Sequence, residues 1–145
     1  MRSISGKVFT AKVTVDRPQE DGLVKKVREE YACMAINFTD CEAKLTKEIG
    51  SADNVKGSFD ILAEAVAPYK EVFIFDEGEI FYKVKIQEVT LDEVSGKDKK
   101  TSYHYLVNAT SFDQARKNIT EALGDSMMDY TIAAIIEQKI LEVIE

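Results

Sequence analysis

The only histidine of the chain lies between two tyrosines, in Tyr103-His104-Tyr105. Histidine titrates near neutral pH and can contact a phosphate or a base, while tyrosine rings can stack on the rings of a ligand. In a strand, however, the two tyrosines point to one face and His104 to the other. No serine, cysteine or second histidine completes a recognised nucleophile motif. We favour a structural role for the three residues, with ligand binding as the alternative.

Two basic clusters are the other candidates for ligand binding. They lie at the starts of two corresponding predicted strands, and they consist of Lys25, Lys26 and Arg28 in the first half and Lys97, Lys99 and Lys100 in the second. Because a lysine ammonium is a compact point charge, two such clusters could bind two phosphates of a nucleotide or a nucleic acid. The competing interpretation is that lysines at exposed strand ends prevent pairing with other chains.

Acidic residues suggest two kinds of metal site, and neither pattern is specific. Glu137-Gln138-Lys139 fits the acid-x-lysine tripeptide of metal-dependent nucleases, to which Asp125 and Asp129 could add ligands. The acidic segment Asp76-Glu77-Gly78-Glu79 lacks the spacing of an EF-hand loop and is typical of a solvated turn. The isolated glycines form no phosphate-binding loop. We therefore expect no metal, no cofactor and no enzymatic activity.

Composition and charge limit the partners of this chain. Its 145 residues, 45% of them hydrophobic and 31% charged, predict one domain over residues 1–145. No apolar run is long enough to cross a bilayer and the first residues lack a secretory pattern, so we expect a cytoplasmic protein. The net charge of -7 disfavours nucleic acid as a partner. Cys33 and Cys41 form no metal-binding or redox motif, and both are interpreted as buried thiols.

The sequence predicts that the secondary-structure elements carrying these residues occur twice in the order strand, strand, helix and strand. In the first half, strands are predicted over residues 7–15 and 24–36, a helix from Thr39, and strand segments over 58–66 and 71–75. Thr39 and Glu42 form a capping-box pattern at the helix start. In the second half, strands are predicted over 81–86 and 101–108, followed by a capping box at Ser111 and Gln114.

The repeat sets the predicted fold. The C-terminal segment 130–144 also fits a helix face, but its match to residues 59–75 favours strand. The sequence therefore predicts an α+β fold: one antiparallel sheet with two helices on one face, built by internal duplication of a strand-strand-helix-strand unit. The pseudo-repeat halves cover about 7–75 and 80–145.

Three segments carry a resemblance to a known family: Thr90-Leu91-Asp92-Glu93-Val94-Ser95-Gly96-Lys97 with Lys99-Lys100, Val107-Asn108-Ala109, and Met128-Asp129-Tyr130-Thr131-Ile132-Ala133. With these segments the chain resembles a small domain-of-unknown-function family found in gut bacteria and their phages. The resemblance implies a phage or mobile-element accessory protein and carries no known activity.

We therefore expect a non-enzymatic binding or interaction protein that holds a protein partner or a phosphorylated small ligand on its sheet face or at the junction of the repeats. Self-association into a homo-oligomer is part of this expectation. The alternatives are nucleotide or nucleic-acid binding through the paired lysine clusters, and a metal-dependent nuclease. The candidate ligand-binding residues are Lys25, Lys26, Arg28, Lys99, Lys100, Tyr103, His104 and Tyr105.

Overall fold

Two long antiparallel hairpins dominate the structure, a computed structural model that describes residues 1–52, 57–124 and 129–145. Strand β2 (Val8–Pro18) pairs with β3 (Val24–Met34), and β6 (Ile80–Leu91) pairs with β7 (Asp98–Ala109). In both hairpins, β-branched and aromatic residues alternate with polar ones, so one face of each strand can be buried.

The described residues form two compact units. Unit 1 comprises Met1–Ser5 and Pro68–Gln138, and unit 2 comprises Gly6–Ala67 and Lys139–Glu145. The chain therefore passes from one unit to the other three times, after Ser5, after Ala67 and after Gln138.

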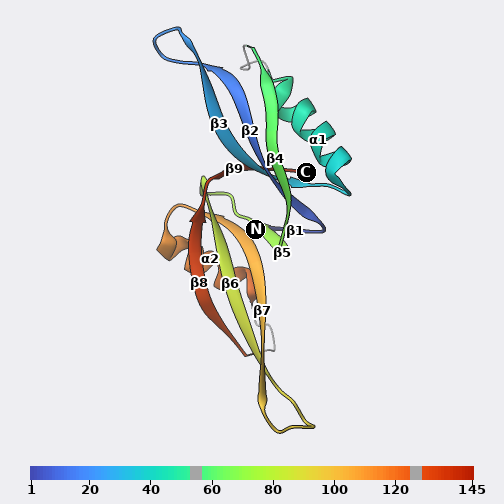
Figure 1. Ribbon diagram of the computed structural model, residues 1–145. Helices are drawn as coiled ribbons and strands as arrows, with labels where there is room; N and C mark the ends of the chain where they lie inside the picture. The colour runs from blue at the N-terminus through green and yellow to red at the C-terminus, as the bar shows by residue number, and fades with distance from the viewer. Residues whose placement is uncertain (53–56, 125–128) are drawn as a thin grey trace. The chain divides into compact units, whose positions relative to one another are not determined.

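Unit 2 is a four-stranded sheet in the order β4-β2-β3-β9. Strand β4 (Phe59–Ala67) runs antiparallel to β2, and β9 (Ile140–Ile144) runs parallel to β3. Helix α1 (Phe38–Leu45) continues into a π-helical turn, η1 (Thr46–Gly50), and covers one face of this sheet (Figure 1). The core between helix and sheet includes Phe9, Val13, Val15, Cys33, Cys41 and Leu45.

Unit 1 is a five-stranded sheet in the order β1-β5-β7-β6-β8. Strand β8 (Tyr130–Gln138) runs antiparallel to β6, β5 (Tyr69–Ile74) runs parallel to β7, and the short β1 (Arg2–Ser5) runs antiparallel to β5. Helix α2 (Phe112–Leu123) covers one face, and its core includes Tyr82, Val84, Ile86, Val107, Ala115 and Ile119. We call the surface of this sheet opposite α2 the open face; it is covered toward the β5 side, where Val72 and Leu106 are 0% exposed.

Capping explains where the two helices begin. The Ser111 hydroxyl accepts a hydrogen bond from the Gln114 backbone N–H at 3.2 Å, so the predicted cap of α2 is confirmed. The predicted cap of α1 at Thr39 is wrong, because Asn37 is the cap and its side chain accepts from the Asp40 N–H at 2.8 Å. Asparagine and threonine both cap helices well, so the local pattern alone does not separate two starts so close together.

The α+β class and the strand prediction for the C-terminal segment are confirmed, since residues 130–138 and 140–144 form β8 and β9. The prediction of one purely antiparallel sheet is wrong, because there are two sheets and each contains a parallel pair. The physical reason is that β5 and β9 follow β4 and β8 in the chain yet pair in the other unit, so no tight hairpin connects them to their neighbours. That residues 1–145 act as one domain stays a prediction.

Candidate functional site

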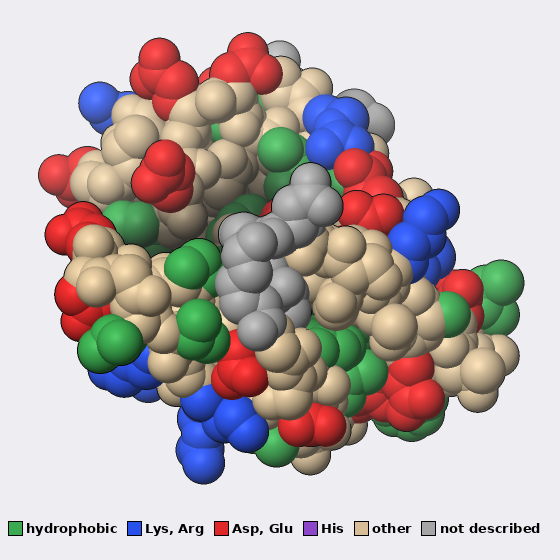
Figure 2. Space-filling view, turned by 90° about the horizontal axis from the view of Figure 1, so that it is seen from above, with side chains coloured by type: hydrophobic (Ala, Val, Ile, Leu, Met, Phe, Trp, Pro, Cys, Tyr) green, Lys and Arg blue, Asp and Glu red, His purple; other side chains and the backbone are tan. Residues whose placement is uncertain are grey.

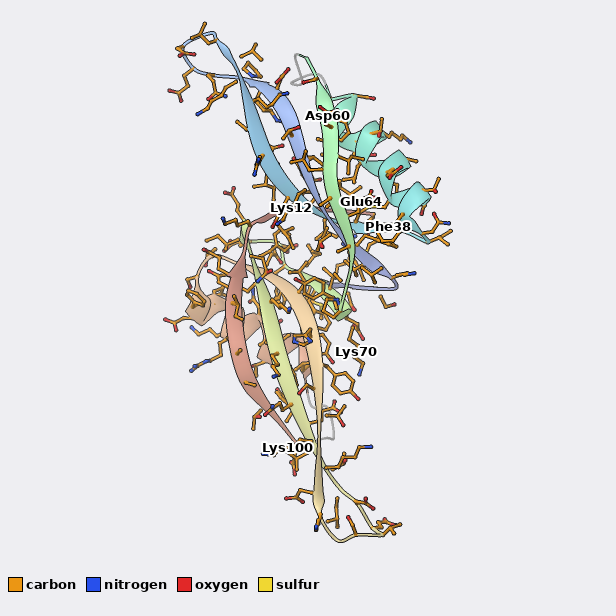
Figure 3. The ribbon with its side chains drawn as sticks, viewed as in Figure 1. Lys12, Phe38, Asp60, Glu64, Lys70 and Lys100 are labelled. Carbon is orange, nitrogen blue, oxygen red and sulfur yellow. The ribbon has the colours of Figure 1, made fainter. Side chains whose placement is uncertain are left out.

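Strand geometry divides each predicted lysine cluster between two faces. On β7, Lys100 lies opposite Val89 of β6 and shares the face of His104, whereas Lys99 points to the other face. Figure 3 labels Lys100 on the distal part of this hairpin. Because neighbouring residues of a strand point in opposite directions, Lys99 and Lys100 do not form one site.

The same division occurs in unit 2. Lys26 lies opposite Asp16 on β2, and Arg28 shares its face, whereas Lys25 lies opposite Arg17 on the helix-covered side. The two predicted clusters also belong to different units. Neither unit by itself therefore contains both clusters.

The tyrosines beside His104 are occupied by packing within unit 1. The Tyr105 ring is 4% exposed and stacks on Phe73 with ring centroids 5.5 Å apart. The Tyr103 ring lies beneath the Lys70 ammonium, with Nζ 4.0 Å from the ring centroid. Both tyrosines face the side of α2, so they do not stack on a ligand at His104.

The open face of unit 1 instead gathers cations from two adjacent strands. Lys85 of β6 lies directly opposite His104 of β7, and Lys83 lies opposite the next residue but one, Leu106. Residues that face each other in an antiparallel pair have Cβ atoms about 5 Å apart, and alternate residues of one strand are about 6.7 Å apart. Lys83, Lys85 and His104 therefore form one group, which we call the cation triad.

Acidic residues of the same sheet lie on the other face. Glu71, Glu88 and Glu137 lie opposite Tyr105, Tyr130 and Tyr82, respectively, all of which face α2. Among the described strand residues of the open face, Asp98 at the far end of β7 is the sole acid. A sheet within a chain of net charge -7 thus presents a positive face.

The electrostatics of His104 reflect this environment. Burial, followed by the charges of Lys83 and Lys85, lowers the pKa of His104 below its ordinary value. The ion pairs of the described residues do not include either lysine. The positive charge of the cation triad is therefore not neutralised by a carboxylate of the strands around it.

On the corresponding face of unit 2, a carboxylate lies close enough to a lysine to neutralise its charge. There the Lys12 ammonium lies 3.7 Å from a Glu30 carboxylate oxygen. A groove of about 320 Å³ beside this pair is lined by Lys12, Arg28, Glu29, Glu30, Leu62, Lys139 and Leu141. On the side displayed in Figure 2, acidic and basic side chains are also interspersed. The triad of unit 1 is therefore the stronger candidate for an anion site.

Sequence reasoning singled out His104 and Lys100 but missed Lys83 and Lys85. A usable signal was present, because Lys83 and Lys85 alternate with the apolar residues of a predicted strand, which puts both lysines on its polar face. Their proximity to His104 depends on the register between β6 and β7, which local patterning does not supply.

The described residues give little support to metal or thiol chemistry. No group of three or more His, Cys, Asp or Glu side chains placed to hold a metal ion occurs among residues 1–52, 57–124 and 129–145. Glu137 belongs to unit 1 and Lys139 to unit 2, while Asp125 lies outside the described residues. Cys33 and Cys41 are buried and free, and burial raises the pKa of both thiols, that of Cys41 to about 12.

Comparison with protein-family models finds a match over most of the chain. The family model described as "Domain of unknown function (DUF4494)" matches residues 7–145. The chain belongs to this family. No curated protein matches the chain, and no solved structure does either. In the part of the chain that the structure describes, neither helix has the length and apolar character needed to span a bilayer.

Proposed function

We propose that this DUF4494 protein is a non-enzymatic binding protein that holds a phosphorylated ligand on the open face of unit 1. The observation that carries the proposal is the cation triad, in which Lys83, Lys85 and His104 share one face while Glu71 and Glu88 lie on the other. Uncompensated cations on a sheet surface attract anions, and lysine provides point charges suited to phosphate.

The dimensions of the positive face favour a ligand with more than one phosphate. Lys83 lies opposite Leu106 of β7, and Lys100 lies six residues before Leu106 on the same strand. The positive face therefore extends over roughly 20 Å along β7. His104 adds a third charge beside the two lysines when it is protonated, so an anion that binds there raises its proton affinity. Binding should therefore tighten as the pH falls through the range in which His104 titrates.

The proposal keeps two further expectations from the sequence. The shared element order of the two units, with an irregularity after Lys12 in the β2–β4 pair and after Lys85 in the β6–β8 pair, supports an origin by internal duplication. A phage or mobile-element setting is consistent with an accessory protein that binds phosphorylated ligands.

A binding titration at low ionic strength tests the proposal. ATP is titrated by calorimetry and a fluorescent single-stranded oligonucleotide by anisotropy, so that a small phosphorylated ligand and a polyanion are distinguished. The double variant Lys83→Gln/Lys85→Gln should weaken binding by roughly tenfold, because two partly exposed charge contacts contribute about 1.4 kcal/mol together.

The control makes the same change of charge away from the triad. Lys97→Gln/Lys99→Gln alters the turn and the other face of the same hairpin, and binding should change less than twofold. Equal losses in the two double variants would show general electrostatic attraction without a site. Absence of binding for both probes at 50 mM salt would reject the proposal.

A further inference from the structure

Strand β8 forms a free edge of the unit 1 sheet. Its neighbour on one side is β6, and it stands last in the strand order. The opposite edge of the sheet is β1, which has only four residues, whereas β8 has nine. Every second residue of an edge strand directs its backbone N–H and C=O groups away from the sheet, where they have no partner strand, and proteins usually protect such edges with charges, proline or short length.

The composition of β8 offers little of this protection. Its residues 130–138 read Tyr-Thr-Ile-Ala-Ala-Ile-Ile-Glu-Gln, with Glu137 as the one charged side chain and no proline. Two large apolar side chains are exposed beside the edge, one on each face of the sheet: Ile136 of β8 is 55% exposed, and Phe112 of α2 is 54% exposed. An open groove of about 680 Å³ lies between α2 and β8, with Phe112, Arg116 and Ile135 among its lining residues.

The free edge strand of unit 2 differs in charge. Strand β4 carries Asp60 and Glu64, which Figure 3 labels on this strand. Burial and the nearby Glu42 raise the pKa of Glu64, and one of its carboxylate oxygens is buried without a hydrogen-bond partner. Pairing two copies of β4 would concentrate carboxylates, which opposes association.

Strand β8 is complementary to itself in an antiparallel pair. The β6–β8 register changes between Lys85 and Ile86, so Ile132 and Ile135 both face α2 although they are three residues apart. If Ile135 lies opposite Ile132 of a second copy, Ile136 lies opposite Thr131 and Glu137 opposite Tyr130. In that register the two residues of each facing pair point to the same side of the combined sheet, except Ala133 and Ala134 at the bulge. No two residues of like charge lie opposite each other.

We propose that β8 is an interface at which two copies of this chain pair edge to edge, related by a two-fold axis. The pairing satisfies the free backbone groups of both edges and covers the exposed Ile136 side chains, and a two-fold interface of this kind is closed. The two cation triads then lie on one continuous open face, with their β6 strands three strand spacings apart, which is roughly 14 Å. The pairing does not depend on the ligand proposal.

Mass measurement over a concentration series tests this interface. Light scattering should give 16.3 kDa at low concentration and twice this mass at high concentration. Ile136→Lys should weaken association at least tenfold, because a lysine ammonium is placed over the interface. Leu62→Lys, a matched change at a 51% exposed position of the β4 edge, should leave association unchanged.

A charge-pair rescue tests the register and excludes simple misfolding. Thr131→Glu alone should also weaken association, whereas the double variant Ile136→Lys/Thr131→Glu should restore it, because opposite charges then face each other twice across the two-fold axis. Circular dichroism and the thermal midpoint verify that each variant folds. A wild-type mass of 16.3 kDa up to millimolar concentration, loss of association in Leu62→Lys, or no rescue in the folded double variant would overturn the proposal.

Discussion

Asn108 links three segments of unit 1 through its side chain, and its replacement should be costly. The side-chain Oδ1 accepts from the Phe75 N–H at 2.7 Å, and Nδ2 donates to the Phe75 carbonyl at 2.9 Å and to the Gly78 carbonyl at 2.8 Å. The residue is 5% exposed, so water cannot readily replace these three hydrogen bonds. They connect β7 to the end of β5 and to the turn that precedes β6.

The structure sets the expected magnitude for Asn108→Ala. Each of the three hydrogen bonds contributes about 1 kcal/mol net, and the backbone groups left behind lie partly at a surface turn, so the loss should be about 3 kcal/mol. This is a large part of a typical unfolding free energy of about 5–15 kcal/mol. For a chain of this length, it corresponds to a decrease in the melting temperature of roughly 6–12 °C.

Urea denaturation followed by circular dichroism measures this loss as a lower midpoint with an unchanged slope. Ser102→Ala is the matched control, because Ser102 is an exposed residue on the same strand and face, and it should change stability by less than about 0.5 kcal/mol. Asn108→Asp separates hydrogen bonding from packing, since it keeps the volume but directs an oxygen at two carbonyls. An aspartate variant as stable as the wild type, or a loss below about 1 kcal/mol in Asn108→Ala, would refute the reasoning.

Three further changes test other parts of the structure. Gly78→Ala should lower the free energy of unfolding by about 3 kcal/mol or more, because φ is +126° and the added Cβ would lie 2.5 Å from a backbone atom of Ala109. Gly96→Ala should cost only about 1 kcal/mol in the same urea assay, because φ is +69° but the space around Gly96 is open. Glu29→Gln should cost about 1–3 kcal/mol in thermal unfolding, because the Arg17 guanidinium, 2.8 Å from the Glu29 carboxylate, loses its charged partner in a half-buried setting. Burial and two nearby lysines lower the pKa of His104 below its ordinary value of 6.5. The contribution of neutral His104 to stability is therefore complete above about pH 6.5 and declines as the pH falls below that value. Between pH 8 and pH 5.5, the urea midpoint should fall less for His104→Gln than for the wild type.

Local sequence patterns were sufficient to predict many of the helices and strands. Alternation predicted the long hairpins, and Ser111 with Gln114 predicted the start of α2. The correspondence between residues 59–75 and 130–144 predicted strand at the C-terminus, where a helix was the alternative. These features depend on interactions between residues close in the chain, or on a repeat that can be read directly from the chain.

The candidate site was only partly accessible to sequence reasoning. His104 and Lys100 were named, but they were grouped with Lys99 and with two tyrosines that point to the other face. Lys83 and Lys85 were not named, although the structure puts them beside His104. Membership of this site depends on which residue of β6 lies opposite which residue of β7.

The sequence by itself determined the α+β class, the positions of most strands and the polar or apolar side of each strand, because these follow from side-chain alternation and capping along a short stretch of chain. Only the tertiary structure decided that β5 and β9 pair in parallel within the other unit, that β1 joins a sheet, and that Lys83, Lys85 and His104 share one face of unit 1. Backbone hydrogen bonds between strands are the same for every side chain, so the choice of partner and register comes from burial summed over the whole unit. That sum is not contained in any local segment.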